Sequence, residues 1–124
     1  MLERLCPAVT CPRYLSDYGL PFDREEGSLS SPNYPGSYPR NLYREYQISA
    51  TRGRIVINFE AFNTERSYDT LTIVDGDGTF LLRNYSGPRR PSEIISKTNQ
   101  VIVYFKTNYY THYGGWKLNW HNTM

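Results

Sequence analysis

Apolar and polar residues alternate with a period of two along several short runs of the chain. In residues 54–60, Ile55, Ile57 and Phe59 fall on one face, while Asn58 and Glu60 fall on the other. This alternation is typical of a half-buried β-strand. Similar runs occupy residues 71–74, 101–105 and 116–120, and weaker candidates lie at 45–49, 80–83 and 93–96.

Turn-forming residues separate these runs, and no stretch of ten or more residues keeps a helical apolar period. The pattern therefore predicts an all-β domain, an antiparallel two-sheet sandwich rather than a barrel. The sequence Asp75-Gly76-Asp77-Gly78 is interpreted as a hairpin turn, since the twelve-residue calcium loop ending in Glu is missing. The expected core residues are Ile55, Ile57, Phe59, Leu71, Ile73, Val101, Val103, Phe105, Leu118 and Trp120.

Composition narrows the class of protein further. The chain has 124 residues, enough for one domain, and its 12 Tyr, 5 Phe and 2 Trp favour strands. Fourteen Lys and Arg against twelve Asp and Glu give a net charge of +2, without the excess expected of a nucleic-acid-binding protein. No apolar run reaches the length of about 18 residues that membrane insertion needs, and residues 1–12 lack the apolar stretch of a signal peptide.

The first residues differ from the rest of the chain. Residues 1–26 show no clear alternation and are interpreted as an N-terminal arm or linker, with residues 27–124 forming the domain. The arm holds both cysteines, Cys6 and Cys11, which either pair with each other, stay free or bridge to another chain.

The sequence lacks the common motifs of enzyme active sites. The chain has two histidines, His112 and His121, without a His-Glu-x-x-His spacing, a Gly-x-Ser-x-Gly elbow or a phosphate-binding glycine loop. We therefore expect a non-catalytic binding module. An active site assembled from distant residues, such as a metal held by the two histidines, is the alternative that sequence motifs do not reveal.

Polar side chains follow or precede three of the predicted strands. Glu65 follows the run that ends at Phe62, Asp69 precedes the run that begins at Leu71, and Asn108 follows the run that ends at Phe105. If these ends converge, their oxygens suit Ca²⁺, which takes about six to eight oxygen ligands. The alternative is that Asp69 caps a turn and that Glu65 is a solvated loop carboxylate.

Aromatic residues gather in the stretch 108–116, beside the same end. Exposed Tyr109, Tyr110 and Tyr113, together with Trp116, would suit a protein partner or stack on a glycan. The alternative is that these rings cover the edge of the sandwich.

Two short motifs carry further hypotheses. Arg89-Arg90, between two prolines, suits an anion, although such loop charges are often only solvated. Asn84-Tyr85-Ser86 is an acceptor triplet for N-glycosylation at Asn84 in a secreted eukaryotic protein.

Several ordered motifs give the chain a family resemblance. The stretch 27–41, reading Gly-Ser-Leu-Ser-Ser-Pro-Asn-Tyr-Pro-Gly-Ser-Tyr-Pro-Arg-Asn, resembles the opening of a CUB domain. Further landmarks follow in that family's order at residues 59–65, 68–76, 86–87, 91, 94–96, 103–105 and 115–116. The resemblance implies a sandwich of two antiparallel sheets that mediates protein recognition in extracellular or secreted proteins.

The resemblance also implies a site. In calcium-binding members of the family, Glu, Asp and Asp stand at the positions of Glu65, Asp69 and Asn108, supported by a Tyr at the position of Tyr38. Oxygens of the stretch matching Tyr110 and Thr111 complete that set, and the loop presents carboxylates to a Lys or Arg of the partner protein. Here Asn108 departs from the pattern, and the spacing from Glu65 to Asp69 is short.

The cysteines depart from the family pattern as well. CUB domains usually carry two disulfides, but Arg44, Arg66 and Ser86 stand at three of the matching positions. Cys11 thereby lacks its usual partner at position 44. The resemblance therefore implies a sandwich that is stabilised by its core alone.

Overall fold

The structure, a computed structural model, describes residues 25–110 and 113–123. This part of the chain forms strands and no helix, so it has no helix that is long and apolar enough to cross a membrane. Its strands are β1 (Glu26–Ser30), β2 (Tyr43–Ser49), β3 (Ile55–Asn63), β4 (Thr70–Asp75), β5 (Phe80–Tyr85), β6 (Ile94–Ile95), β7 (Gln100–Lys106) and β8 (Gly115–Asn122).

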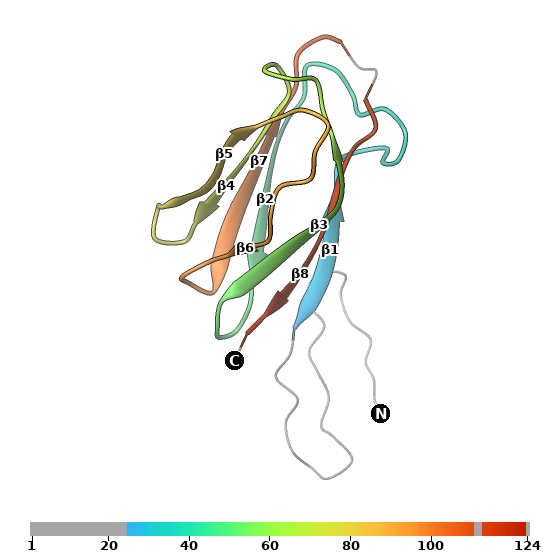
Figure 1. The fold of residues 1–124 in the computed structure, drawn as a ribbon. Coiled ribbons are helices and arrows are strands. Elements are labelled where there is room, and N and C mark those ends of the chain that lie inside the picture. Colours follow the sequence, from blue (N-terminus) through green and yellow to red (C-terminus); the bar gives the residue numbers. More distant parts are fainter. Residues whose placement is uncertain (1–24, 111–112, 124) are drawn as a thin grey trace.

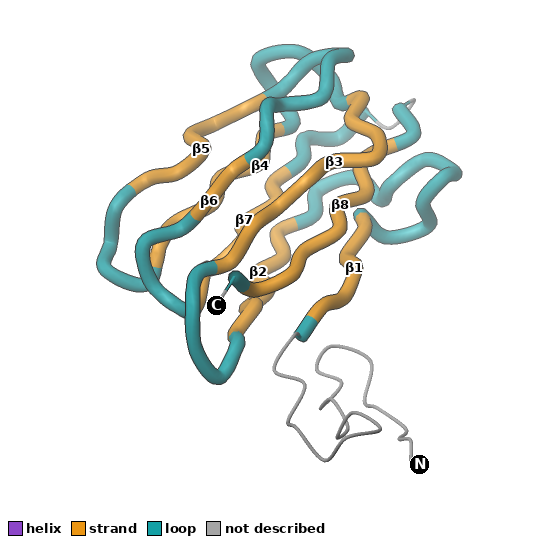
Figure 2. The backbone as a smooth tube through the Cα atoms, turned by 60° about the horizontal axis from the view of Figure 1, so that its bottom comes forward, coloured by secondary structure: helices purple, strands orange, loops and turns teal. Residues whose placement is uncertain are grey.

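The strands form two antiparallel sheets that lie face to face (Figures 1 and 2). One sheet has the order β1-β8-β3-β6, and the other has the order β2-β7-β4-β5. Except for the β4–β5 hairpin, each connection crosses from one sheet to the other. The predicted all-β sandwich is therefore confirmed.

The inner faces of both sheets meet in one core. All ten residues expected to fill this core are buried, as are Tyr38, Ile48, Phe62 and Trp116. Aromatic rings pack edge to face within it: the Phe105 ring centroid lies 5.1 Å from that of Tyr38 and 5.6 Å from that of Trp116. Period-two alternation thus identified the buried face of each main strand correctly.

Strand β1 was not expected from the sequence pattern. Its residues, Glu-Gly-Ser-Leu-Ser, lack apolar alternation, and it begins at Glu26, the last residue of the predicted arm. Pairing with β8 brings Gly27 opposite Trp120, where a Cβ atom on Gly27 would lie 2.8 Å from the indole Nε1. The indole is thus covered by a residue without a side chain. Cys6 and Cys11 lie outside the described residues, and their pairing stays a prediction.

Residues 75–79 form the predicted hairpin turn between β4 and β5. The Asp75 N–H donates to the Thr79 carbonyl over 2.8 Å, and Gly78 adopts a φ of +93° that favours glycine. The Asp75 carboxylate is buried and accepts hydrogen bonds from the Lys97 N–H, at 2.6 Å, and from the Thr98 hydroxyl, at 2.6 Å. Burial alone would raise the pKa of Asp75, but these hydrogen bonds outweigh it and lower the pKa.

Replacing Phe59 by Ala tests the core. Phe59 is 6% exposed, so Phe59→Ala should lower the free energy of unfolding by about 3 to 5 kcal/mol, through lost transfer energy and a cavity. Urea denaturation measures this loss. Phe80→Ala is the matched control, since Phe80 is 48% exposed. Equal losses in the two variants would contradict the assigned faces.

The Asp75 contacts predict a pH dependence. Folding lowers the pKa of this carboxyl group below its value in the unfolded chain, which is about 3.9. Such a group stabilises the native state at any pH above the unfolded pKa, and the stabilisation is lost as the pH falls through the lower pKa of the folded state. Asp75→Asn should therefore cost about 1 to 3 kcal/mol at pH 7. The difference in free energy of unfolding between this variant and the wild type should shrink as the pH falls below about 3. Chemical denaturation across this pH range measures both, and a constant difference would contradict the role of the charge.

Candidate functional site

Four crossing loops lie at one end of the sandwich, at the top in Figure 1. They are residues 31–42, 64–69 and 86–93 and the described residues of loop 107–114, namely 107–110 and 113–114, and they connect β1 to β2, β3 to β4, β5 to β6 and β7 to β8. The ends of β3 and β7 and the start of β4 thereby lie at the same end of the sandwich, as we expected from the positions of Glu65, Asp69 and Asn108 in the sequence. The candidate site is built on these loops.

The Asp69 side chain joins three of the loops. It is fully buried at the start of β4, at 0% exposure. Its Oδ2 accepts a short hydrogen bond from the Tyr38 hydroxyl, and its Oδ1 accepts the Asn108 N–H at 2.8 Å. A buried carboxylate requires such donors, because burying an unpaired charge is costly. Asp69 therefore fixes loops 31–42 and 107–114 against loop 64–69.

A tight turn brings Glu65 to the same place. The Asp69 N–H donates to the Glu65 carbonyl over 3.0 Å, so the short spacing between the two residues closes one turn of chain. The Glu65 N–H in turn donates to the Tyr38 hydroxyl oxygen over 3.3 Å. Tyr38 thus contacts both acidic residues.

Tyr38 is a buried residue of this network and does not lie on the surface. It is 1% exposed. Burial, and to a smaller extent the hydrogen bond to Asp69, raises the pKa of its hydroxyl group well above the ordinary range. The hydroxyl therefore stays protonated and donates to Asp69 at any physiological pH. Tyr38 positions the acidic residues and is itself shielded from a partner.

Glu65 carries an unpaired oxygen at this site. Its side chain is half-buried, and its Oε1 atom is buried without a hydrogen-bond partner. The Asn108 Oδ1 accepts the Tyr110 N–H at 2.9 Å and keeps a second lone pair. Within residues 25–110 and 113–123, no three His, Cys, Asp or Glu side chains gather as metal ligands. The donor set that suits Ca²⁺ is thus two carboxylates and one amide oxygen.

The aromatic loop divides into exposed and buried residues. Tyr109 and Tyr110 are 61% and 50% exposed, with ring centroids 4.8 Å apart. Tyr113 is half-buried against the core, and Trp116 is fully buried at 0% exposure. The expectation that Trp116 could stack on a glycan is therefore wrong, because its ring fills the core. Thr111 and His112 lie outside the described residues.

Sequence reasoning missed several residues that position the site. The Thr64 hydroxyl donates to the Asp69 carbonyl at 2.9 Å and accepts the Gly87 N–H at 3.2 Å. The Thr107 hydroxyl accepts the Leu42 N–H at 2.8 Å and donates to the Pro39 carbonyl at 3.0 Å. Each Thr directly follows a strand, which is the signal that could have identified it. Tyr68, at 64% exposure, is a further exposed ring beside Asp69.

The two remaining sequence motifs lie on or near β5. Asn84 is exposed, has a φ of +49° and lines an open groove with Phe80 and Tyr104. Its exposure is compatible with an attached glycan, and glycosylation stays a prediction. Arg89 and Arg90 are exposed on loop 86–93.

The sequence is similar to several known proteins. The chain matches the family model described as CUB domain over residues 18–120. It is 30% identical over 111 residues to cubilin of Homo sapiens and 36% identical over 89 residues to the Dorsal-ventral patterning protein tolloid of Drosophila melanogaster. These matches cover 83% and 66% of this chain but 3% and 8% of the relatives, so the chain spans a small part of their length.

A solved structure shows the same fold. The crystal structure of the MASP-1 CUB2 domain bound to Ca²⁺ is similar with a TM-score of 0.71 at 24% identity, covering 77% of this chain and 90% of that chain. The family match begins at residue 18, within the stretch interpreted as an arm. The division at residue 26 stays a prediction.

Removing the Tyr38 hydroxyl tests the network. Tyr38→Phe leaves the buried Asp69 carboxylate with one donor fewer and should lower the free energy of unfolding by about 1 to 3 kcal/mol. Urea denaturation at pH 7 measures the loss. Tyr43→Phe makes the same chemical change at a side chain that is 60% exposed. If the two variants were equally stable, the hydroxyl would not be needed to fix the loops.

Proposed function

Because the chain belongs to the CUB domain family, a family of protein-interaction modules of extracellular proteins, we propose that it is a non-catalytic module that binds a protein partner outside the cell. The four-loop end carries the recognition surface. Calcium orders this end, the half-buried Glu65 carboxylate receives a Lys or Arg side chain of the partner, and the fully buried Asp69 carboxylate holds the metal and the loops.

The observation that carries this proposal is the unpaired Oε1 atom of Glu65. It is a buried carboxylate oxygen that the described protein does not satisfy, and such an atom costs free energy unless a cation or donor approaches it. It lies in the turn that also presents Asp69. A cation is therefore the ligand that the chemistry of this turn favours.

The residues that would hold calcium are Glu65, Asp69 and Asn108, with oxygens of Tyr110 and Thr111 as further ligands by family resemblance. Both Asp69 oxygens already accept one hydrogen bond each and keep further lone pairs. Bound calcium would offset the charge of the carboxylates and hold their loops together. Asn108 supplies no charge, so we expect weaker binding than three carboxylates would give.

The surroundings of this turn suit a protein partner. Exposed tyrosines flank two of the proposed calcium ligands in sequence, with Tyr68 next to Asp69 and Tyr109 next to Asn108. Exposed Tyr rings beside a charged anchor are typical of the residues that contribute most to protein interfaces. Since Trp116 is buried, a glycan would lack the largest aromatic surface of the loop, and a protein is the favoured partner.

Calcium binding tests the proposal. At about 100 times its dissociation constant, calcium should raise the free energy of unfolding by about 2.7 kcal/mol, because it binds only the folded chain. Asp69→Ala should abolish this gain, and Asn108→Asp should increase it by adding a charged ligand. Calorimetry and thermal denaturation with calcium or a chelator measure these effects.

Glu65→Gln separates metal binding from folding, since Oε1 contributes no hydrogen bond to the fold. This variant should keep the stability of the metal-free chain but lose most of the gain from calcium. Glu45→Gln, an exposed change on β2, should keep the full gain. If millimolar calcium leaves the wild-type melting temperature unchanged, the proposed metal site is refuted.

A further inference from the structure

A basic pocket lies between the β3–β4 and β5–β6 loops, next to the turn that carries Glu65. Its volume is about 420 Å³, within the range of small-ligand sites. Arg66, Tyr85, Ser86, Pro88 and Arg89 line it. We propose that this pocket binds a tetrahedral oxyanion, the sulfate or phosphate group of a ligand.

The charge of the pocket favours an anion. Arg66 and Arg89 place two cationic residues in the lining of one cavity, and no Asp or Glu of the described residues lines it. Neither arginine forms an ion pair with any residue in the described ranges 25–110 and 113–123. Two like charges in one cavity repel each other, and an oxyanion between them would remove that repulsion. Guanidinium groups also match sulfate and phosphate geometry through paired N–H donors.

The backbone that carries Arg66 is fixed on both sides. The Thr64 N–H donates to the Gly87 carbonyl over 3.0 Å, and the turn that follows is closed by the Asp69 N–H to the Glu65 carbonyl. A Cβ atom on Gly87 would lie 3.7 Å from the Arg66 Cζ, so the guanidinium lies against this glycine. Gly87 has a φ of +105°, a conformation that favours glycine.

Arg89 is held in a similar way. The Tyr85 hydroxyl donates to the Arg89 carbonyl over 3.0 Å, and Pro88 restricts the backbone before it. The Ser86 Oγ accepts the Ser67 N–H at 2.8 Å, which leaves its own hydroxyl hydrogen as a further donor in the pocket. The lining residues therefore come from two loops that are already joined, so a bound anion would order little additional chain.

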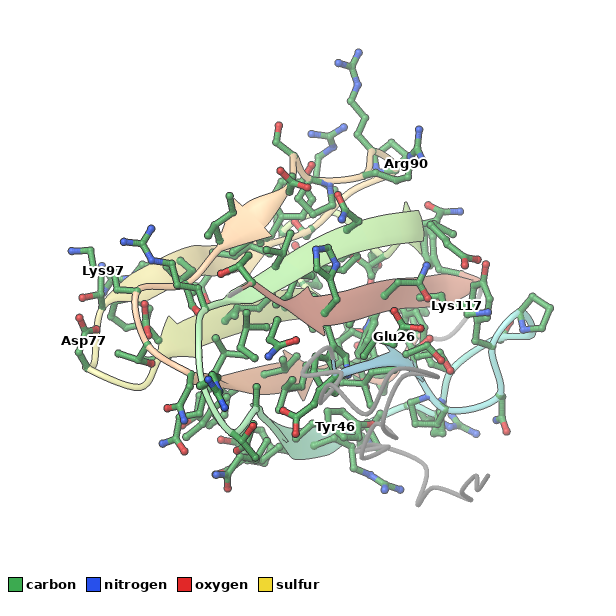
Figure 3. The ribbon with its side chains drawn as sticks, turned by 90° about the horizontal axis from the view of Figure 1, so that it is seen from below. Glu26, Tyr46, Asp77, Arg90, Lys97 and Lys117 are labelled. Atoms are coloured by element: carbon green, nitrogen blue, oxygen red, sulfur yellow. The ribbon has the colours of Figure 1, made fainter. Side chains whose placement is uncertain are left out.

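The neighbouring Arg90 provides a matched control. It belongs to the same loop and carries the same charge, but it does not line this pocket. Its guanidinium instead donates to the Phe59 carbonyl oxygen over 3.5 Å, so the side chain lies next to β3 and outside the pocket (Figure 3). A pocket-specific effect should therefore depend on Arg89 and not on Arg90.

Titration of the 124-residue chain with inorganic sulfate tests the proposal. In calcium-free buffer of constant ionic strength, NMR should show saturable amide shifts at Arg66, Ser86 and Gly87, with a dissociation constant on the order of millimolar. Arg66→Ala and Arg89→Ala should each weaken binding by about tenfold or more. Arg90→Ala should change it by less than about twofold, since a distant charge is screened.

Two further probes assign the source of the group. A sulfated and a phosphorylated monosaccharide are titrated in the same way, and the tighter of the two identifies the ester that the pocket prefers. Equal losses in Arg90→Ala and Arg89→Ala, or shifts that never saturate, would overturn the proposal, because diffuse surface charge would then explain the binding. The Glu65→Gln variant should bind sulfate normally, so this outcome is independent of the calcium site.

Discussion

The buried carboxylate of Asp69 is the group on which the functional end of the molecule depends. It lies at 0% exposure and must be hydrogen-bonded there, and its two donors come from loops more than thirty residues away on either side. Satisfying one side chain therefore fixes three loops. The unpaired Glu65 oxygen, the exposed tyrosines and the basic pocket all lie on loops that this contact, or the Thr64 contacts beside it, hold in place.

Much of this fold follows from alternation alone. β3, β4, β7 and β8 were predicted because their apolar residues face one core, and hydrophobic burial acts on each strand locally. β1 could not be predicted in this way, because it is a strand only through its pairing with β8. Pairing between distant strands leaves no periodic signal in the sequence of either strand.

The candidate site was predictable to a similar degree. Strand ends placed Glu65, Asp69 and Asn108 together, and the family resemblance added Tyr38. The position directly after a strand could have identified Thr64 and Thr107, but it does not reveal their partners, because three of the four hydrogen bonds of their hydroxyl groups reach backbone groups 23 to 68 residues away. The basic pocket could be predicted only in part. Arg89 was a candidate for anion binding in the sequence, but its proximity to Arg66 depends on which loops the two sheets bring together.

Hydrogen bonds join the loops where the family resemblance places missing cysteines. Arg66 and Ser86 stand at two such positions, and here the Ser67 N–H bonds to the Ser86 Oγ while Thr64 and Gly87 exchange two hydrogen bonds. These contacts are reversible and cost little to open one at a time, unlike a covalent bridge. Loops joined in this way keep their mutual position without depending on the redox state of the surroundings.

The chain enters and leaves the sandwich at the end opposite the four loops (Figure 1), where Glu25 and Asn122 bond to each other across β1 and β8. A pulling force applied at Glu25 and Asn122 would act on the hydrogen bonds between the antiparallel strands β1 and β8 and break them one after another. Mechanical load would thus separate β1 from β8 beginning at Glu25, and the hydrogen bonds nearest the four loops would break last.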